Sequence, residues 1–404
     1  MLRLPVEAHA SHAAAAWVEV DLGAIAHNVR VFRSMLPSAC RLIAVVKADG
    51  YGHGMLRVAR AALAAGADEL AVANVAEGAV LRIAGVRAPI LLAGPLAPAD
   101  AGLVVQHGLV ASLGGYEAAA ALSRATHRFL PVQIEVDTGM RRHGVALRDL
   151  AAFVDAVLAR GRLSIAGVYT HFAANGPADL PAMRAQLDAF CAVVDALPAL
   201  RGVRRHACNT LAASLLPEAR LDAVRIGGGL YGFDPLRGGA SGGLGVRPAL
   251  ALKARVVGLR AAAVGERVGY GGAFVCARPT QLALLPIGYG DGLARELWHG
   301  AEVLVRGRRA RLVGAISMNQ AVVDVTDLPP VVFGEEVVLL GEQGTDRVDA
   351  EARVPPGGSV YEVTALLSPR LPRQFVGGCG DNAPHPRGAV EHGRMRAEPT
   401  DPRR

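Results

Sequence analysis

Eight short apolar runs in the first 230 residues constrain the fold of this chain more than any other feature. Most of the runs are continuous rather than alternating, as in strands that are buried on both faces. Stretches rich in Ala, Leu and Arg with helical spacing separate them, and strands alternating with helices indicate a parallel sheet. We therefore expect an α/β fold, a (β/α)8 barrel of the TIM type. The expected strands are 42–46, 70–73, 89–92, 109–113, 132–136, 165–170, 205–208 and 223–226, and the clearest helices are 55–65, 75–84, 116–125, 147–159 and 180–196.

A different pattern begins after Gly239. Residues 237–248 are rich in Gly and contain Pro and Ser, which is typical of a linker or a long loop. Short runs separated by Gly, Pro and Asp follow, without a long helical segment, so we expect a C-terminal all-β domain. Its expected strands are 249–257, 280–286, 301–306, 311–316, 321–325 and 336–340. The predicted organisation is an N-terminal extension (1–16), the barrel (17–245), the β domain (246–376) and a disordered tail (377–404).

The composition argues against several classes of function. Lys and Arg exceed Asp and Glu by 43 − 36 = 7, but the sequence has no basic stripe interleaved with aromatics, so we expect no nucleic-acid binding. The five cysteines include no CxxC pair, which argues against a disulfide framework or a metal site and favours a reduced, cytoplasmic enzyme. No apolar run reaches the ~18 residues of a membrane span. Glu7, His9 and His12 interrupt the Ala-rich start, so we do not expect a signal peptide.

Polar groups and glycine loops follow five of the expected barrel strands. Chemistry in such a barrel sits at the carboxyl ends of the strands, so these positions are candidates for an active site. They are Lys47, residues 137–142, His171, Asn209 with Thr210, and Arg225 with the triple glycine 227–229.

Lys47 and the triple glycine together indicate one cofactor. A lysine directly after a buried strand projects into the barrel mouth, where burial lowers its pKa and favours Schiff-base chemistry. Three glycines after the last strand offer backbone N–H groups to a phosphate, and Thr210 adds a hydroxyl. An imine-forming lysine beside a phosphate site predicts pyridoxal 5'-phosphate (PLP).

A series of motifs resembles the alanine racemase family. The most specific is AVVKADGYGHG (44–54), which is similar to the family's PLP-attachment signature. The others, in order, are DTGM (137–140), YTHF (169–172), VGYG (268–271), PIGYGDG (286–292), SMNQ (317–320) and RLPR (370–373). The resemblance covers about residues 17–373 and implies a PLP barrel followed by a β domain. It also implies a head-to-tail homodimer in which the partner's β domain completes each site.

The resemblance implies a two-base racemisation. Lys47 resembles the cofactor lysine, which is also one acid/base group, and Tyr270 resembles the second group, supplied by the other subunit. Inversion at Cα needs a proton removed on one face and delivered on the other, so two bases must flank the substrate. By resemblance, Lys47 takes the proton from the D-substrate and Tyr270 from the L-substrate.

Further site residues are implied by the same resemblance. Arg225 matches the donor to the pyridine nitrogen, and His171 matches a residue packed on the ring. Arg142 and the backbone N–H of Met318 match contacts to the substrate carboxylate. The phosphate ligands are matched by Tyr51, Thr210, Gly228 and Tyr361, with Asn209 beside them, and Tyr289 lies in a matching motif as a supporting residue.

Four positions depart from the family pattern. Glu135 stands where many members carry a carbamylated lysine, so we expect a direct Glu135–Arg142 pair and no carbamylation. Arg141 replaces a usual glycine, Thr210 a usual serine and Asn319 a usual aspartate. The changes at Asn319 and Arg141 leave the substrate range open.

The function implied is a PLP-dependent isomerase that interconverts L- and D-alanine and supplies D-alanine for peptidoglycan. One alternative is a racemase for serine, lysine or arginine, or one of broader range. A second is a non-catalytic PLP-binding protein, against which Tyr270 and the β domain argue. A third is a decarboxylase of the same fold, against which SMNQ argues because it lacks the usual cysteine.

Overall fold

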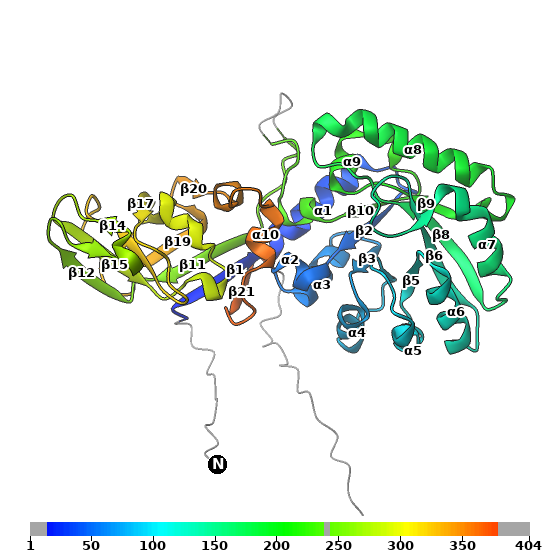
Figure 1. Ribbon diagram of the computed structural model, residues 1–404, viewed down its shortest axis with the longest axis horizontal. Helices are drawn as coiled ribbons and strands as arrows, with labels where there is room; N and C mark the ends of the chain where they lie inside the picture. The colour runs from blue at the N-terminus through cyan, green and yellow to red at the C-terminus, as the bar shows by residue number, and fades with distance from the viewer. Residues whose placement is uncertain (1–13, 238–242, 379–404) are drawn as a thin grey trace, which may run out of the picture.

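A closed barrel of eight parallel strands forms one lobe of the molecule (Figure 1). The computed structural model describes residues 14–237 and 243–378. The strand order is β2-β3-β4-β5-β6-β8-β9-β10, and pairing of β10 with β2 closes the ring. The expected barrel is therefore confirmed. Its strands are β2 (Arg41–Val45), β3 (Glu69–Val72), β4 (Ile90–Leu92), β5 (Val110–Leu113), β6 (Leu130–Asp137), β8 (Leu163–Thr170), β9 (Arg204–His206) and β10 (Ala223–Ile226), with the short β7 (Val145–Ala146) beside β6.

The continuous apolar strands serve two cores. Leu42 and Ala44 of β2 belong to the large core that is shared with the helices. Ile43, between them, belongs to a separate small cluster with Ala71 and Leu91. Successive side chains of a strand point to opposite faces, so both faces of β2 are buried. This explains why the sequence shows runs rather than alternation.

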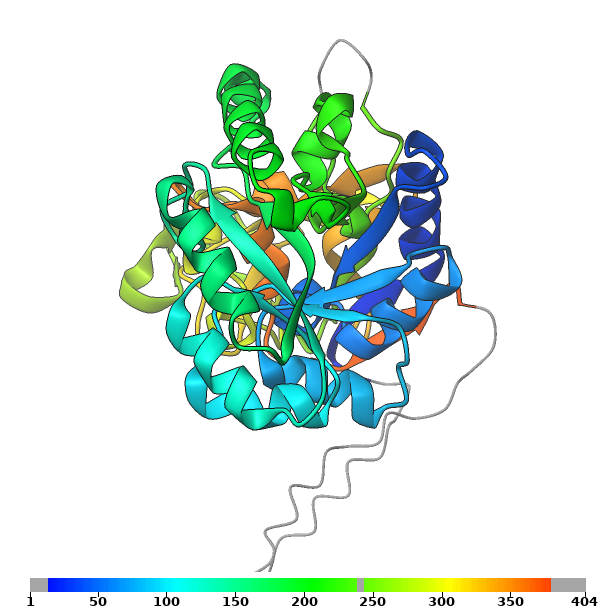
Figure 2. The ribbon, with the colours of Figure 1, turned by 90° about the vertical axis from the view of Figure 1, so that its right-hand side faces the viewer.

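Helices surround these strands, as the end-on view shows (Figure 2). Five of the predicted helices are present, whereas α1, α5 and α9 were missed. The apolar pattern of α1 is broken by the buried Asn28, whose side chain donates to the carbonyls of Leu230 and Arg247. The helices are α1 (Leu22–Met35), α3 (Met55–Ala64), α4 (Val75–Ile83), α5 (Ala101–Gln106), α6 (Tyr116–Ala125), α7 (Leu150–Leu158), α8 (Leu180–Asp195) and α9 (Thr210–Leu215).

The second lobe is an all-β domain, as expected from the sequence. It contains a ten-stranded sheet and the small hairpin β13–β14. One short helix, α10 (Val360–Ala365), lies where the two lobes meet (Figure 1). The strands are β1 (Ala16–Asp21), β11 (Leu250–Arg255), β12 (Gly258–Ala262), β13 (Arg267–Val268), β14 (Phe274–Val275), β15 (Thr280–Leu285), β16 (Glu302–Val305), β17 (Arg308–Leu312), β18 (Ala321–Asp324), β19 (Glu336–Gln343), β20 (Asp346–Val348) and β21 (Arg373–Val376).

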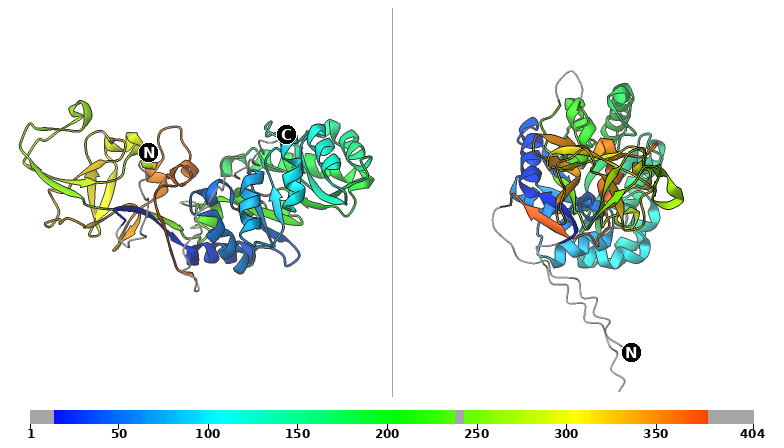
Figure 3. Two further views of the ribbon diagram at one scale, coloured as in Figure 1. Left: turned by 90° about the horizontal axis from the view of Figure 1, so that it is seen from below. Right: turned by 90° about the vertical axis from the view of Figure 1, so that its left-hand side faces the viewer.

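Strand β1 corrects the predicted domain boundary. The sequence assigned residues from 17 onward to the barrel, but β1 pairs antiparallel with β11 and parallel with β21 in the sheet of the β domain. In Figure 3 (left), the blue β1 leaves that sheet and leads into the barrel. Its partners lie more than 200 positions away, and local patterns do not reveal such pairing.

Some predictions fall wholly or partly outside the described residues. They are the N-terminal extension before residue 14, the centre of the linker (238–242) and the tail after residue 378. Cys40, Cys191, Cys208 and Cys276 are free thiols. Among the helices of residues 14–237 and 243–378, none is long and apolar enough to span a membrane.

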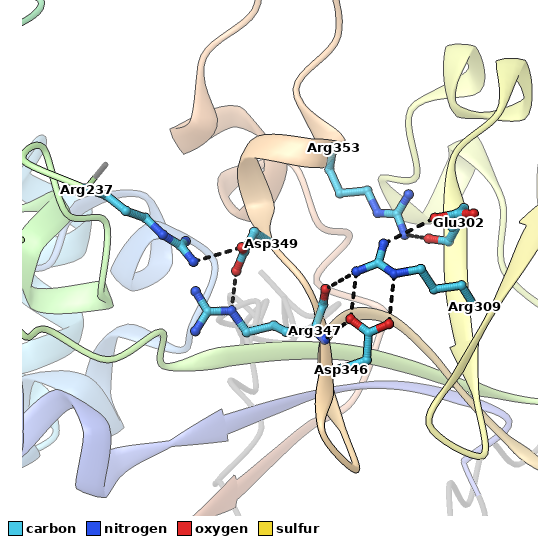
Figure 4. A network of polar contacts seen from close by, with 7 residues as sticks. All are labelled: Arg237, Glu302, Arg309, Asp346, Arg347, Asp349 and Arg353. Carbon is cyan, nitrogen blue, oxygen red and sulfur yellow. Dashed lines mark hydrogen bonds and ion pairs between the residues drawn. The ribbon is translucent and has the colours of Figure 1, made fainter. Parts of the chain in front are cut away.

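An ion-pair network joins the segment after the barrel to the β domain (Figure 4). Arg237 donates to Asp349 at 2.8 Å, and Arg347 also donates to Asp349. Arg309 forms two hydrogen bonds with Asp346, at 2.7 and 2.8 Å. Exposed ion pairs gain strength when several charges share one network, so this cluster helps to fix the orientation of the two lobes.

Gly341 tests the packing of the β domain. It has a φ of +117°, and an added Cβ would lie 2.7 Å from Cβ of Ala251 on β11. Gly341→Ala should therefore destabilise the chain by about 1–3 kcal/mol from overpacking, in addition to backbone strain. Gly85→Ala is the control because Gly85 has a φ of +84° but open space around it. Urea midpoints measure both variants, and equal losses would contradict the packing argument.

Candidate active site

Lys47 begins a left-handed turn, α2 (Lys47–Tyr51), one residue after the end of β2. Ala48, Asp49 and Tyr51 have φ values of +53°, +51° and +52°, and Gly50 lies between them at +64°. The left-handed conformation costs about 1–2 kcal/mol for each non-glycine residue. Such backbone persists only where the surroundings hold it in place, and it clusters at functional sites.

Three side chains hold this turn. Glu77 at the start of α4 accepts from the backbone N–H of Ala48 at 2.7 Å. Asp49 accepts from the N–H of Met55 at 2.8 Å. Arg373, within the RLPR motif, donates to the carbonyl of Gly52 at 3.1 and 3.2 Å. The segment that carries Lys47 is thus tied to both lobes.

The triple glycine lies beside this turn. An added Cβ on Gly227 would stand 2.6 Å from the hydroxyl of Tyr51, and one on Gly228 would stand 2.8 Å from the hydroxyl of Tyr361. Thr210 Oγ1 accepts from the N–H groups of Gly227 and Gly229 at 3.1 and 3.2 Å. A side chain at Gly227 or Gly228 would fill the space next to the two tyrosine hydroxyls. We call the residues around this space the glycine cradle: Tyr51, Thr210, Gly227, Gly228 and Tyr361.

The tyrosines of the cradle are suited to bind an anion. Burial raises the pKa of Tyr51 and of Tyr361, so both hydroxyls keep their protons at neutral pH. Within the described residues neither hydroxyl has a hydrogen-bond partner. Asn209 stands next to the cradle and caps α9 by accepting from the N–H of Ala212 at 3.0 Å.

Arg225 is buried inside the barrel and makes contacts in several directions. Its NH2 group donates to the carbonyls of Thr170 and Ala207 at 2.8 and 3.0 Å and lies 3.3 Å from Nδ1 of His171. Its NH1 group donates to Nδ1 of His206 at 2.6 Å. Burial lowers the pKa of Arg225, but a guanidinium stays charged in a protein.

A second layer of polar side chains lies behind Arg225. Because arginine has only donors, Nδ1 of His206 must accept, and its Nε2–H then donates to Gln133 at 2.6 Å. Burial and the Arg225 charge hold the pKa of His206 well below its usual value, so the ring is neutral. Tyr169 stacks on His206 with ring centroids 4.7 Å apart and lies 2.6 Å from Ser112 Oγ.

Glu135 does not pair with Arg142, so that prediction was wrong. Its carboxylate contacts His143 Nδ1 at 2.7 Å and accepts from the Tyr169 hydroxyl at 2.9 Å. Gly144, next to His143, has a φ of +109°, and an added Cβ there would stand 3.2 Å from Cγ of Glu135. Arg142 makes no ion pair within the described residues, and Arg141 pairs with Asp137 at 3.1 Å.

Sequence reasoning missed this inner polar layer. Tyr169, His206, Gln133, Ser112 and His143 were not singled out as site residues. A signal was present: four of them are polar residues within apolar barrel strands, and Gln133 and Glu135 stand two positions apart on β6, hence on one face. The high apolar content of these strands predicts their burial and obscures the alternation of polar residues within them.

Burial and nearby charges shift the pKa values of Lys47 and His171 at the barrel mouth. The pKa of Lys47 is lowered, first because the surrounding protein desolvates the amine and second because of the positive charge of Arg142. The negative charge of Glu77 offsets part of this shift. Burial, then Arg225 and Arg142, lower the pKa of His171 to about 3. A neutral imidazole and an amine of reduced basicity therefore share this mouth.

The remaining candidates lie on the β domain. Tyr270 is 71% exposed and starts the 3₁₀ turn η7 (Tyr270–Gly272) of hairpin β13–β14, whose β14 lies at the end of that lobe remote from the barrel (Figure 1). Met318 is 58% exposed, and its carbonyl accepts from the N–H of Gly290 at 2.7 Å. Within one chain, the structure does not bring Tyr270 to Lys47.

Asn319 and Tyr289 belong to the same pair of loops. The Asn319 side chain donates to Asp291 at 3.2 Å, and the N–H of Tyr289 donates to the carbonyl of Ser317 at 3.1 Å. An aspartate at 319 would place a second carboxylate beside the buried Asp291. Asn319 removes that repulsion and binds its loop to the neighbouring one.

Comparison with known proteins decides the family. The N-terminal domain of alanine racemase matches residues 20–235, and the C-terminal domain matches residues 249–375. The chain belongs to the alanine racemase family. A relative from Symbiobacterium thermophilum, named alanine racemase, is 40% identical over 369 residues, which cover 90% of this chain and 97% of the relative.

Solved structures of the family share the whole architecture. The alanine racemase from E. faecalis is 31% identical, with a TM-score of 0.83 over 91% of this chain and 99% of the other. A histidine racemase from Leuconostoc mesenteroides is 29% identical, with a TM-score of 0.81 over 91% and 99% of the two chains. The two-domain fold of this chain is thus the fold of the family.

Glu135→Gln tests the carboxylate of the inner polar layer. Burial raises the pKa of Glu135, but His143, Tyr169 and Arg225 outweigh burial and lower it overall. A lowered pKa contributes stability that is present above the unfolded pKa of about 4.3 and is lost as the pH falls through the folded pKa. The variant should therefore lose more stability at about pH 7 than at about pH 3.

Urea unfolding at both pH values provides the measurement. Glu117→Gln removes an exposed carboxylate on α6 and is the control for charge removal. Equal losses for Glu135→Gln at the two pH values would show that the carboxylate is not stabilised in its ionised form.

Proposed function

We propose that this chain is a PLP-dependent alanine racemase that acts as a homodimer in the cytoplasm and supplies D-alanine for peptidoglycan. The observation that carries the proposal is the glycine cradle beside Lys47, at the carboxyl ends of adjacent strands β10 and β2. Family membership supports the racemase activity, because the relatives and structures named alanine racemase align over nearly their whole length.

The residues at the barrel mouth fit PLP. The glycine cradle offers free tyrosine hydroxyls and a space that a Cβ would fill, as a phosphate group requires. Lys47 would bind the aldehyde carbon, and Arg225 would donate to the ring nitrogen with His171 packed against the ring. When bound, the cofactor supplies the electron withdrawal that makes the Cα proton of an amino acid acidic.

Lys47 and Tyr270 would move the Cα proton. Lys47 would act on one face of the substrate and Tyr270 of a second subunit on the other, because inversion requires both faces. The lowered pKa of Lys47 favours proton transfer near neutral pH. Tyr270 is exposed on the β domain and remote from the barrel of its own chain, which supports a site shared between subunits.

The other residues would bind and orient. Arg142 has no carboxylate partner in the described chain, so its guanidinium is free to bind the substrate carboxylate, together with the N–H of Met318 from the partner. Arg225 would hold the ring nitrogen without protonating it, since a guanidinium does not give up its proton. Burial of Arg225 among fixed acceptors keeps that donor in place.

A wider or different substrate range is the second candidate. The likeness to a histidine racemase at 29% identity shows that the fold can accompany a larger side chain. Asn319 is held by Asp291, so it would affect substrate choice through the position of Met318 and its loop rather than by direct contact.

The cofactor assignment has a direct test. Purified protein should show the visible absorption of PLP bound to Lys47, and Lys47→Ala should lose both this band and racemisation. Racemisation of L-alanine should exceed that of L-serine, L-lysine, L-arginine and L-histidine by more than about tenfold, or about 1.4 kcal/mol. A faster larger substrate would favour the second candidate, and bound cofactor without racemisation would contradict the racemase.

Mixed subunits test the shared site. Lys47→Ala and Tyr270→Phe should each be inactive, but a mixture allowed to exchange subunits should recover about a quarter of wild-type activity. Half of the dimers are then mixed, and one of their two sites receives both intact residues. If each site lay within one chain, mixing would restore nothing, and light scattering gives the oligomeric state independently.

A further inference from the structure

We propose that Glu77 is the positioning residue for Lys47: its carboxylate ties the backbone just after Lys47 to the end of β3 and so sets where the amine stands at the barrel mouth. The inference rests on the proposed function in one respect, that Lys47 is the reactive amine. Glu77 lies on α4, outside the motifs that carry the family resemblance, and sequence reasoning assigned it no role.

The two carboxylate oxygens of Glu77 are used separately. Oε1 accepts from the N–H of Ala48 at 2.7 Å, and Oε2 accepts from the N–H of Ala73 at 2.8 Å. Ala73 directly follows β3, so one carboxylate bridges the ends of β2 and β3. Hydrogen bonds from N–H groups to a carboxylate are stronger than those to a neutral acceptor.

The position of Glu77 is itself fixed. Its own N–H donates to the side chain of Asn74, the N-cap of α4, at 2.9 Å. Gly78 packs so closely that an added Cβ would stand 2.7 Å from Leu109. The helix is thus anchored at its first turn, and Glu77 reaches the turn of Lys47 from a rigid base.

The turn needs this strap at Ala48. Ala48 is the first of three non-glycine residues in the left-handed region, and Glu77 is the acceptor of its N–H within the described chain. Without that acceptor, a return of Ala48 to a right-handed conformation would redirect the adjoining peptide and the Lys47 side chain. A displacement of about 1 Å in a reacting group can cost roughly a hundredfold in rate.

The negative charge of Glu77 also raises the pKa of Lys47. Arg142 from the loop after β6 opposes it, His171 at the end of β8 is neutral, and Asp49 and Tyr51 stand on the turn itself. Loss of the Glu77 charge leaves Arg142 unbalanced at Lys47. The apparent pKa of the lysine should then fall.

Three variants separate position from charge and from stability. Glu77→Gln keeps the size but turns an amide donor toward one of the two N–H groups, so one bond and the charge are lost. Glu77→Asp keeps the charge on a shorter side chain. Val80→Gly is the matched control, because it weakens the same helix at an exposed position and leaves Glu77 and its Asn74 cap in place.

Steady-state kinetics and the pH dependence of the bound cofactor's visible absorption are the readouts. For Glu77→Gln we expect kcat to fall at least about tenfold with KM changed less than about threefold, since the amine is misplaced while the substrate contacts remain. Its absorption titration should shift to lower pH, whereas Glu77→Asp should keep the wild-type titration. Val80→Gly should lower only the thermal midpoint.

Two results would overturn the inference. The first is a Glu77→Gln variant that loses stability like Val80→Gly but keeps the wild-type kcat and titration. The second is a Val80→Gly variant whose kcat and titration change as much as those of Glu77→Gln, since the effect would then belong to the helix.

Failure of the proposed function can be recognised separately. If the wild-type protein does not racemise amino acids, the inference is tested on the cofactor-free chain. The measurement is the rate at which added PLP labels Lys47. The imine is trapped with borohydride and the labelled residue is located by mass spectrometry. A lower limiting rate of labelling at high pH, where the amine is neutral, together with a lower apparent pKa of the labelling rate in Glu77→Gln than in wild type, would still support the strap. Labelling of Glu77→Gln identical to that of the wild type would contradict the inference.

Discussion

A guanidinium enclosed in the barrel requires hydrogen-bond acceptors, and much of the inner architecture follows from that need. Arg225 sits among strand ends, where backbone carbonyls and the ring nitrogens of His171 and His206 face it. Burying such a charge without a partner would strongly destabilise the folded state. The accepting Nδ1 of His206 and the donation of its Nε2–H to Gln133 are consequences of one buried cation.

The barrel mouth combines this rigid floor with a strained rim. The floor is fixed by packing and hydrogen bonds among strands, while the rim that carries Lys47 holds a conformation that its residues disfavour on their own. Strain of this kind is sustained by contacts from elsewhere, here from Glu77, Asp49 and Arg373. Catalytic precision would thus depend on residues in α4 and β21 as well as on the lysine itself.

The sequence predicted the eight barrel strands and the two-domain order because both depend on local patterns. Continuous apolar runs indicate strands that are buried on both faces, and the shift to short runs separated by Gly indicates a change from an α/β to an all-β domain. Strand β1 escaped prediction because its partners are remote in sequence, and α1 because Asn28 points inward. The Glu135–Arg142 pairing failed because His143 and Tyr169 bind the carboxylate instead, through tertiary contacts that no local pattern reveals.

The sheet of the β domain has a consequence for synthesis of the chain. Val18 of β1 pairs with Arg373 of β21, which leaves the ribosome 373 − 18 = 355 residues later. At about 5–20 residues per second, β1 waits roughly 20–70 s for that neighbour, while the barrel between them can already close. β1 can pair with β11 earlier, but the edge of β1 that pairs with β21 stays open until β21 is made, and an open strand edge is a site of aggregation.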